Sequence, residues 1–159
     1  MQVDWQKEID KRKEALLTDL TEMLKIESVR DEKRGSKNAP FGPGPREALD
    51  KFLEIGNRDG FEVLNLDGIV GHLEYGTGAE TMGILAHVDV MPAGKGWDTD
   101  PFNPVIKDGK LFARGSSDDK GPGMAAYYGL KLIKELNLPI RKKVRMIIGT
   151  DEESGWRCM

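Results

Sequence analysis

One histidine and six carboxylates, grouped in three short segments, are the residues of this sequence best suited to chemistry. His87–Asp89 ends an apolar run, Asp118–Asp119 lies in a glycine-rich turn, and Asp151–Glu153 follows a second apolar run. Imidazole and carboxylate groups without cysteine suit divalent zinc, cobalt or manganese. Two such ions about 3.5–4 Å apart, sharing one carboxylate, are a common hydrolytic arrangement. The three segments therefore predict a metal site.

The spacing of His87 and Asp89 favours cooperation between their side chains. Residues two apart in an extended chain point to the same side. The carboxylate can therefore accept the N–H of one imidazole nitrogen and leave the other nitrogen free for a metal. Taken alone, the pair also fits two polar residues at the end of a strand.

The acidic pairs allow a structural interpretation as well as a chemical one. Asp118 or Asp119 could cap the helix that follows, but this explains one aspartate more easily than two. Bound phosphate is disfavoured because adjacent carboxylates would repel it. Glu152 and Glu153 could lie in a solvated loop. Alternatively, one could face a metal and the other could act as general base on a water molecule.

Other residues with catalytic potential lack suitable partners. His72 falls in the middle of a predicted strand and is expected to be structural. Cys158 has no second histidine placed to activate it. Ser116 and Ser117 lack the Gly-x-Ser-x-Gly context of a nucleophile elbow.

Hydrophobic periodicity predicts the elements that position these groups. A strand, a hairpin, a helix and a second strand form a crossover unit, which implies a parallel pair in a covered sheet. Ligands bind beyond the carboxyl ends of such strands, and the acidic segments fall near these ends. The expected helices are 5–26, 46–60 and 120–137, the strands are 61–66, 70–76, 82–90 and 143–150, a further hairpin turns at 108–109, and 31–45 is a loop. The apolar strands 82–90 and 143–150 are expected to be buried.

Composition narrows the class of protein. The chain has 159 residues, 24 basic and 27 acidic side chains and a net charge of −3, which suits a globular domain without a nucleic-acid partner. No apolar run reaches the roughly 20 residues that span a bilayer, so no membrane partner is expected. The first residues carry charges instead of the apolar run of a secretory signal. A single cysteine fits a reducing compartment, so a cytoplasmic enzyme or binding domain is expected.

Four ordered motifs resemble one enzyme family. They are His-x-Asp at His87, Trp-x-x-Asp-Pro-Phe at Trp97, Ser-Asp-Asp-Lys-Gly at Ser117 and Glu-Glu at Glu152. In this order they resemble the co-catalytic zinc metallopeptidases that include aminoacylase, carboxypeptidase G and dipeptidase V. The match is closest to the dipeptidase V type of bacterial dipeptidase, and it covers essentially the whole chain. Ala113 is a minor departure, because glycine often stands there.

The resemblance implies a role for each candidate residue. His87 would bind one of two zinc ions, with Asp89 orienting its ring. Asp118 would bridge both ions, Glu153 would bind the second, and Glu152 would be the general base. Cobalt or manganese could replace zinc. The implied substrate is a dipeptide or a small N-acyl amino acid, so dipeptidase activity is expected and deacylase or desuccinylase activity is the alternative.

The family is considerably longer than this sequence, and it carries a further acidic ligand, a C-terminal histidine ligand and an inserted lid domain. We therefore expect an α/β fold with a mixed, largely covered sheet and flanking helices. Residues 1–159 would form the N-terminal portion of the catalytic domain. With two protein ligands per ion, this portion alone is expected to be mostly metal-free and inactive. The family also implies a cis peptide between Asp118 and Asp119.

Overall fold

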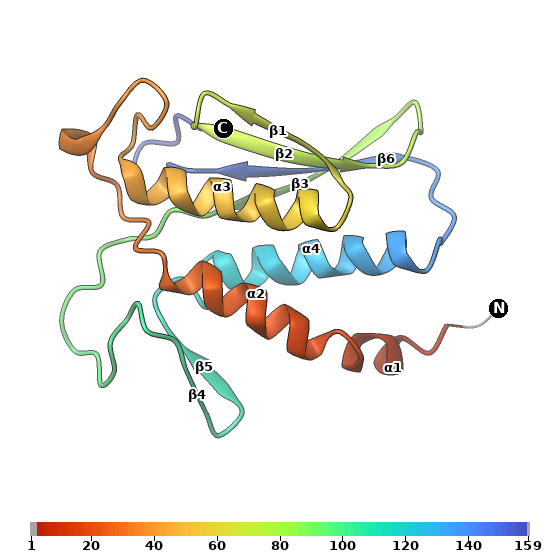
Figure 1. Ribbon diagram of the computed structural model, residues 1–159, viewed down its shortest axis with the longest axis horizontal. Coiled ribbons are helices and arrows are strands. Elements are labelled where there is room, and N and C mark those ends of the chain that lie inside the picture. Colours follow the sequence, from red (N-terminus) through yellow and green to blue (C-terminus); the bar gives the residue numbers. More distant parts are fainter. Residues whose placement is uncertain (1–2, 159) are drawn as a thin grey trace.

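The computed structural model describes residues 3–158, in which helices pack against one side of a four-stranded mixed sheet (Figure 1). The sheet order is β1-β2-β6-β3, and β4 and β5 form a separate hairpin that projects away from the sheet. The elements are α1 Trp5–Asp10, α2 Lys13–Lys25, the short 3-10 helix η1 Glu32–Arg34, α3 Pro43–Arg58, β1 Glu62–Leu66, β2 Val70–Tyr75, β3 Thr81–His87, β4 Val105–Lys107, β5 Lys110–Phe112, α4 Lys120–Glu135 and β6 Lys143–Gly149.

The parallel pairing of β3 with β6 confirms the predicted crossover and places the candidate segments side by side. His87 at the end of β3 pairs with Gly149 at the end of β6. The residues that follow each strand therefore leave the sheet together, and Val88 donates its N–H to the Gly149 carbonyl at 3.0 Å. This register brings 87–89 next to 151–153.

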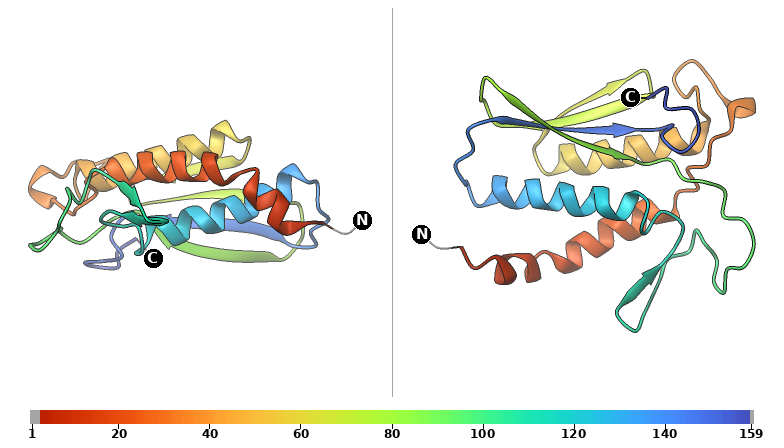
Figure 2. Two further views of the ribbon diagram at one scale, coloured as in Figure 1. Left: turned by 90° about the horizontal axis from the view of Figure 1, so that it is seen from below. Right: turned by 180° about the vertical axis from the view of Figure 1, so that it is seen from behind.

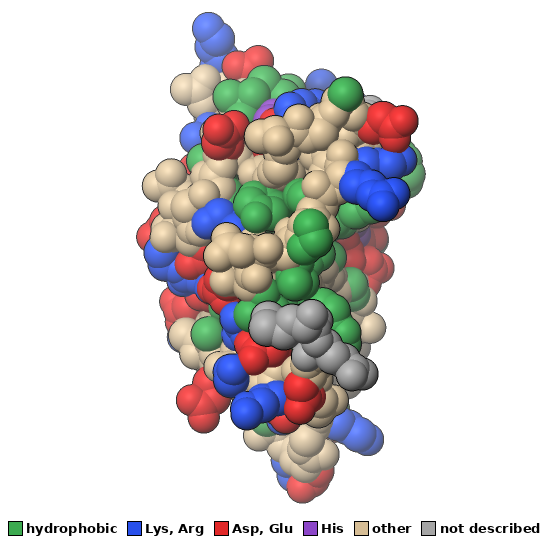
Figure 3. Space-filling model, turned by 90° about the vertical axis from the view of Figure 1, so that its right-hand side faces the viewer, with side chains coloured by type: hydrophobic (Ala, Val, Ile, Leu, Met, Phe, Trp, Pro, Cys, Tyr) green, Lys and Arg blue, Asp and Glu red, His purple; other side chains and the backbone are tan. Residues whose placement is uncertain are grey.

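The helices form two layers beneath the sheet. α3 packs on β1 and β2, α4 packs on β3, and α2 lies across α3 and α4, as both views of Figure 2 show. Apolar side chains fill the space between the layers, and Tyr127 of α4 lies at its centre with edge-on contact to Phe52 of α3. At the end of the molecule that carries the N-terminus, exposed hydrophobic side chains form a strip among charged residues (Figure 3). No helix within residues 3–158 is long and apolar enough to cross a membrane.

A buried lysine ties the start of α4 to the end of α2. The Lys120 ammonium donates hydrogen bonds to the carbonyls of Met23 at 2.9 Å and Ile26 at 2.8 Å. These carbonyls lie at the C-terminal end of α2, where helix carbonyls lack internal donors. The contact fixes the residue that directly follows Asp118 and Asp119.

Three expectations about the elements are wrong in part. The helix expected over 5–26 is broken at Arg12. Its backbone N–H bonds to the Ile9 carbonyl in a tighter turn, and its guanidinium donates a hydrogen bond to the Glu8 carbonyl. The loop expected over 31–45 contains η1, and α3 begins at Pro43, since proline is well suited to a first helical turn.

The third correction concerns the strand expected to be covered on both faces. β3 is an edge strand, and Leu85 is 65% exposed on the side of the sheet opposite the helices. The register aligns Leu64, His72, Ile147 and Leu85 in one row across this open face. The apolar run thus predicted the strand correctly, but residues 3–158 do not cover the second face of β3.

Candidate metal centre

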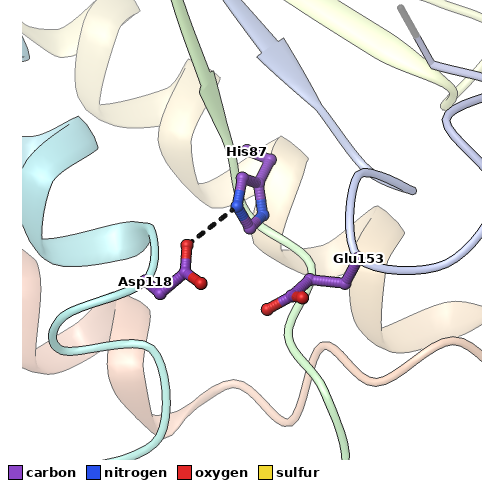
Figure 4. A group of neighbouring side chains, drawn as sticks. All are labelled: His87, Asp118 and Glu153. Atoms are coloured by element: carbon purple, nitrogen blue, oxygen red, sulfur yellow. Dashed lines mark hydrogen bonds and ion pairs between the residues drawn. The ribbon is translucent and has the colours of Figure 1, made fainter.

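Three side chains from separate segments converge at the carboxyl ends of β3 and β6. His87, Asp118 and Glu153 each offer a ligand atom, and these atoms lie within 4.8 Å of one another. Within residues 3–158 they are the one such group of three or more histidine, cysteine or acidic residues. Figure 4 shows the two carboxylates pointing into the space beside the His87 ring.

The two nitrogens of His87 face different partners. Nδ1 lies 3.1 Å from the Asp89 carbonyl oxygen and 3.4 Å from its carboxylate. Nε2 lies 3.3 Å from the Asp118 carboxylate and 3.7 Å from that of Glu152. A proton on Nδ1 held by Asp89 would leave Nε2 as the nitrogen that can bind an ion.

Asp89 also holds the two glutamates, a role that the sequence did not indicate. Its buried carboxylate accepts the backbone N–H of Glu152 on one oxygen and that of Glu153 on the other, each at 3.1 Å. One side chain therefore fixes the histidine ring and the turn that carries both glutamates. Charged acceptors of backbone N–H groups form strong hydrogen bonds.

Asp119 supports the site from the other side. Its carboxylate accepts the backbone N–H of His87 at 3.1 Å, and the peptide between Asp118 and Asp119 is cis, as expected. The Asp118 side chain is 73% exposed, so the space beside His87 is open to solvent. A shallow pocket of about 230 Å³ adjoins it, lined by Leu85, Ala86, His87, Asp119, Glu152 and Trp156.

The electrostatics are those of a crowded acidic site. Burial lowers the pKa of His87, but the hydrogen bonds and charge of Asp89 outweigh this effect and raise it to about 9. Burial and the nearby charge of Asp118 raise the pKa of Glu153. Burial likewise raises the pKa of Asp119. A divalent cation would relieve the repulsion among these carboxylates and would displace the proton from His87.

The donor set fits a divalent metal ion. One imidazole nitrogen and two carboxylate oxygens are the ligands found in zinc and manganese sites, and Asp89 supplies the supporting hydrogen bond that ligating histidines usually have. His72 lies outside this group, in β2 and 4.0 Å from Glu74. Cys158 is buried and burial raises the pKa of its thiol, which disfavours the reactive thiolate.

Known proteins are similar to this chain in sequence and in fold. Residues 83–159 match the profile of peptidase family M20/M25/M40. The Bacillus subtilis protein YtjP, whose dipeptidase name is provisional, is 51% identical over 99% of this chain. A similarly named Staphylococcus aureus protein is 49% identical over 97% of the chain. The chain spans 34% and 33% of the length of these two relatives.

Solved structures agree with the sequence matches. Human carnosine dipeptidase 1 is 26% identical with a TM-score of 0.75, and it matches 95% of this chain and 35% of its own. The dipeptidase Dug1p from Saccharomyces cerevisiae has the same fold, with a TM-score of 0.80 at 23% identity over 96% of this chain and 35% of its own. Residues 83–159 are thus similar in sequence to peptidase family M20/M25/M40, and the chain shares the fold of the two solved dipeptidases.

Proposed function

We propose that the protein is part of a metal-dependent dipeptidase that uses two zinc ions and Glu152 as general base. The convergence of His87, Asp118 and Glu153 within 4.8 Å is the observation that carries this proposal. The dipeptidase names of the relatives support the substrate class. The chain covers about a third of those relatives, so the proposal concerns the protein in its full extent.

Each residue has a distinct task in this scheme. His87 would bind one ion, Glu153 the other and Asp118 both, while Asp89 keeps the His87 ring in place. Bound zinc polarises the carbonyl of the scissile amide and lowers the pKa of water. Glu152 would take the proton from the attacking water and deliver it to the departing amine. Its carboxylate lies 3.7 Å from His87 Nε2, the nitrogen that would bind an ion, and this proximity supports the assignment.

The test compares substrates and variants of the protein expressed from its complete gene. With zinc present, it should hydrolyse dipeptides and leave tripeptides intact. A preference for N-acyl amino acids would instead favour deacylase action. Replacing Glu152→Gln should reduce turnover by about 10²–10⁴-fold while zinc is still bound.

The matched control is Glu54→Gln, which makes the same chemical change at a side chain that is 71% exposed in α3. This variant should keep full activity. Normal turnover by the Glu152→Gln variant would contradict the proposed base. Failure of the unmodified protein to bind a divalent metal would overturn the proposed function as a whole.

A further inference from the structure

Asp151, the residue directly before the two glutamates, is a buried carboxylate with an unusual set of partners. It is fully buried, and its Oδ1 accepts a hydrogen bond from Arg30 at 2.5 Å. Its Oδ2 accepts the backbone N–H of Arg157 at 3.2 Å. A buried carboxylate is costly unless it is paired in this way, so the pair with Arg30 fixes where residue 151 lies.

The arginine is itself held firmly. Its guanidinium lies 5.3 Å from the centre of the buried Phe41 ring and donates a second hydrogen bond to Glu32 at 2.5 Å. Arg157 lies 5.4 Å from the same ring and 3.3 Å from the same glutamate. Two arginines, two carboxylates and one aromatic ring thus form a closed cluster behind the turn that carries Glu152 and Glu153.

Close packing at Gly155 shows that the turn and the arginine have little room to shift. A Cβ added at Gly155 would lie 2.7 Å from Arg30 Nη1 and 2.8 Å from Asp151 Oδ2. A larger residue there would force the guanidinium or the carboxylate to shift. The turn and the ion pair are therefore closely packed against each other.

The segment that carries Arg30 also holds the other strand end of the site. Ser28 donates its hydroxyl to the Val88 carbonyl at 2.6 Å, and its own carbonyl accepts the N–H of Val90 at 3.1 Å. These bonds flank Asp89. A single segment after α2 thus contacts both the histidine side and the glutamate side of the site, although it contributes no ligand.

We propose that Arg30 is a positioning residue that sets the separation of His87 and Glu153 through its ion pair with Asp151. It touches no reacting group, and it acts by fixing the turn at 151–155 relative to residues 88–90. This inference rests on the proposed function, because the separation matters only if both residues bind metal. Loss of Arg30 would leave Asp151 buried without a countercharge, and the turn would move.

The experiment compares Arg30→Met with Arg34→Met in the protein expressed from its complete gene. Arg34 is exposed in η1 of the same segment and has no ion pair within residues 3–158, so it controls for the same chemical change. Zinc affinity, measured by competition with a chromophoric chelator, should fall about 10–100-fold for Arg30→Met and remain unchanged for Arg34→Met. The absorption spectrum of bound cobalt should also change for Arg30→Met alone.

A conservative variant guards against simple misfolding. Arg30→Lys keeps the charge but loses the two-pronged geometry, so its zinc affinity should lie between those of the unmodified protein and Arg30→Met. Backbone hydrogen exchange of the metal-free proteins should accelerate in residues 150–157 and stay unchanged in α3 and α4. If the Arg30→Met variant does not fold, the zinc affinity and hydrogen exchange of Arg30→Lys test the positioning role.

The two proposals fail in different ways. If the unmodified protein binds no metal, the proposed function is overturned, and the exchange of residues 150–157 still tests the positioning role. If the unmodified protein binds zinc and both Arg30 variants match it in affinity and in hydrogen exchange, the positioning role is overturned. A uniform rise in exchange over α3 and α4 for Arg30→Lys would equally show that Arg30 acts only on general stability.

Discussion

At the scale of single residues, Asp89 connects the most parts of the candidate centre. It contacts His87 and accepts the N–H groups of both glutamates. We expect Asp89→Asn to weaken zinc binding about 10–100-fold, because an amide group cannot accept from both backbone donors. Chelator competition on the protein expressed from its complete gene measures this. The control Asp108→Asn lies at an exposed turn with a positive φ that asparagine tolerates, and equal affinities for the two variants would contradict the prediction.

The sequence predicted which residues gather at the site but not all that they do. The ends of apolar elements located the three segments, and the resemblance to the metallopeptidases then selected His87, Asp118 and Glu153 within them. The bonds from Asp89 to the backbone of 152–153 could not, since they depend on the turn after β6. The ion pair of Arg30 with Asp151 joins residues 121 positions apart, and no local pattern signals such a contact.

At the scale of elements, two glycines of α4 give opposite predictions. A Cβ at Gly121 would lie 2.0 Å from the Ser116 carbonyl oxygen, whereas a Cβ at Gly129 would have no neighbour within 4 Å. We expect Gly129→Ala to stabilise the protein by about 0.5–1 kcal/mol through higher helix propensity. Gly121→Ala should destabilise it, because the loop before Asp118 must move away. Urea unfolding measures both, and equal shifts for the two variants would be inconsistent with this packing.

Element types were more predictable than their surroundings. Alternating residues identified β1 and β2, and the Asp-Gly pairs marked both hairpin turns, where Asp67 and Asp108 adopt positive φ. At the break between α1 and α2, Arg12 also donates a hydrogen bond to Glu135 of α4 at 2.7 Å, and no local pattern signals this long-range contact. The open face of β3 was also unpredictable. An apolar run indicates that a strand is buried, but it does not indicate which element covers each face.

At the scale of the whole molecule, a polar network joins the helices and makes stability depend on pH. Asp59 accepts hydrogen bonds from Arg58 at 3.0 Å, Tyr127 at 2.6 Å and Lys131 at 2.7 Å. Burial alone would raise the pKa of Asp59, but these bonds outweigh it and hold the pKa well below its usual value. A lowered folded pKa stabilises above the unfolded value of 3.8, and this stability is lost as pH falls below it.

We therefore expect Asp59→Asn to lose stability near neutral pH and to lose less on acidification than the unmodified protein. Urea unfolding at about pH 7 and about pH 2.5 measures the difference. The exposed Asp108→Asn variant should follow the unmodified protein at both pH values. An equal loss on acidification in Asp59→Asn and the unmodified protein would exclude Asp59 as the source.

The number of ligands leads to a prediction for the 159-residue chain by itself. Within residues 3–158 the site gathers three side chains that could bind a metal, whereas two ions with three protein ligands each and one ligand in common need five. Titration calorimetry with zinc should therefore show weak binding by this chain, and no dipeptide hydrolysis should be measurable. Tight binding of two ions would refute this and would show that the three side chains suffice.

The place of β6 has a consequence for how the protein is made. β6 lies between β2 and β3 although it is the last of the four strands along the chain. A ribosome that has released His87 must add 149 − 87 = 62 more residues before the partner Gly149 exists. At about 5–20 residues per second this takes roughly 3–12 seconds, during which β3 is an unpaired apolar strand. Transiently unpaired apolar strands favour aggregation, so we expect the yield of soluble protein in cells to rise when chaperones are co-expressed, and an unchanged yield would contradict this expectation.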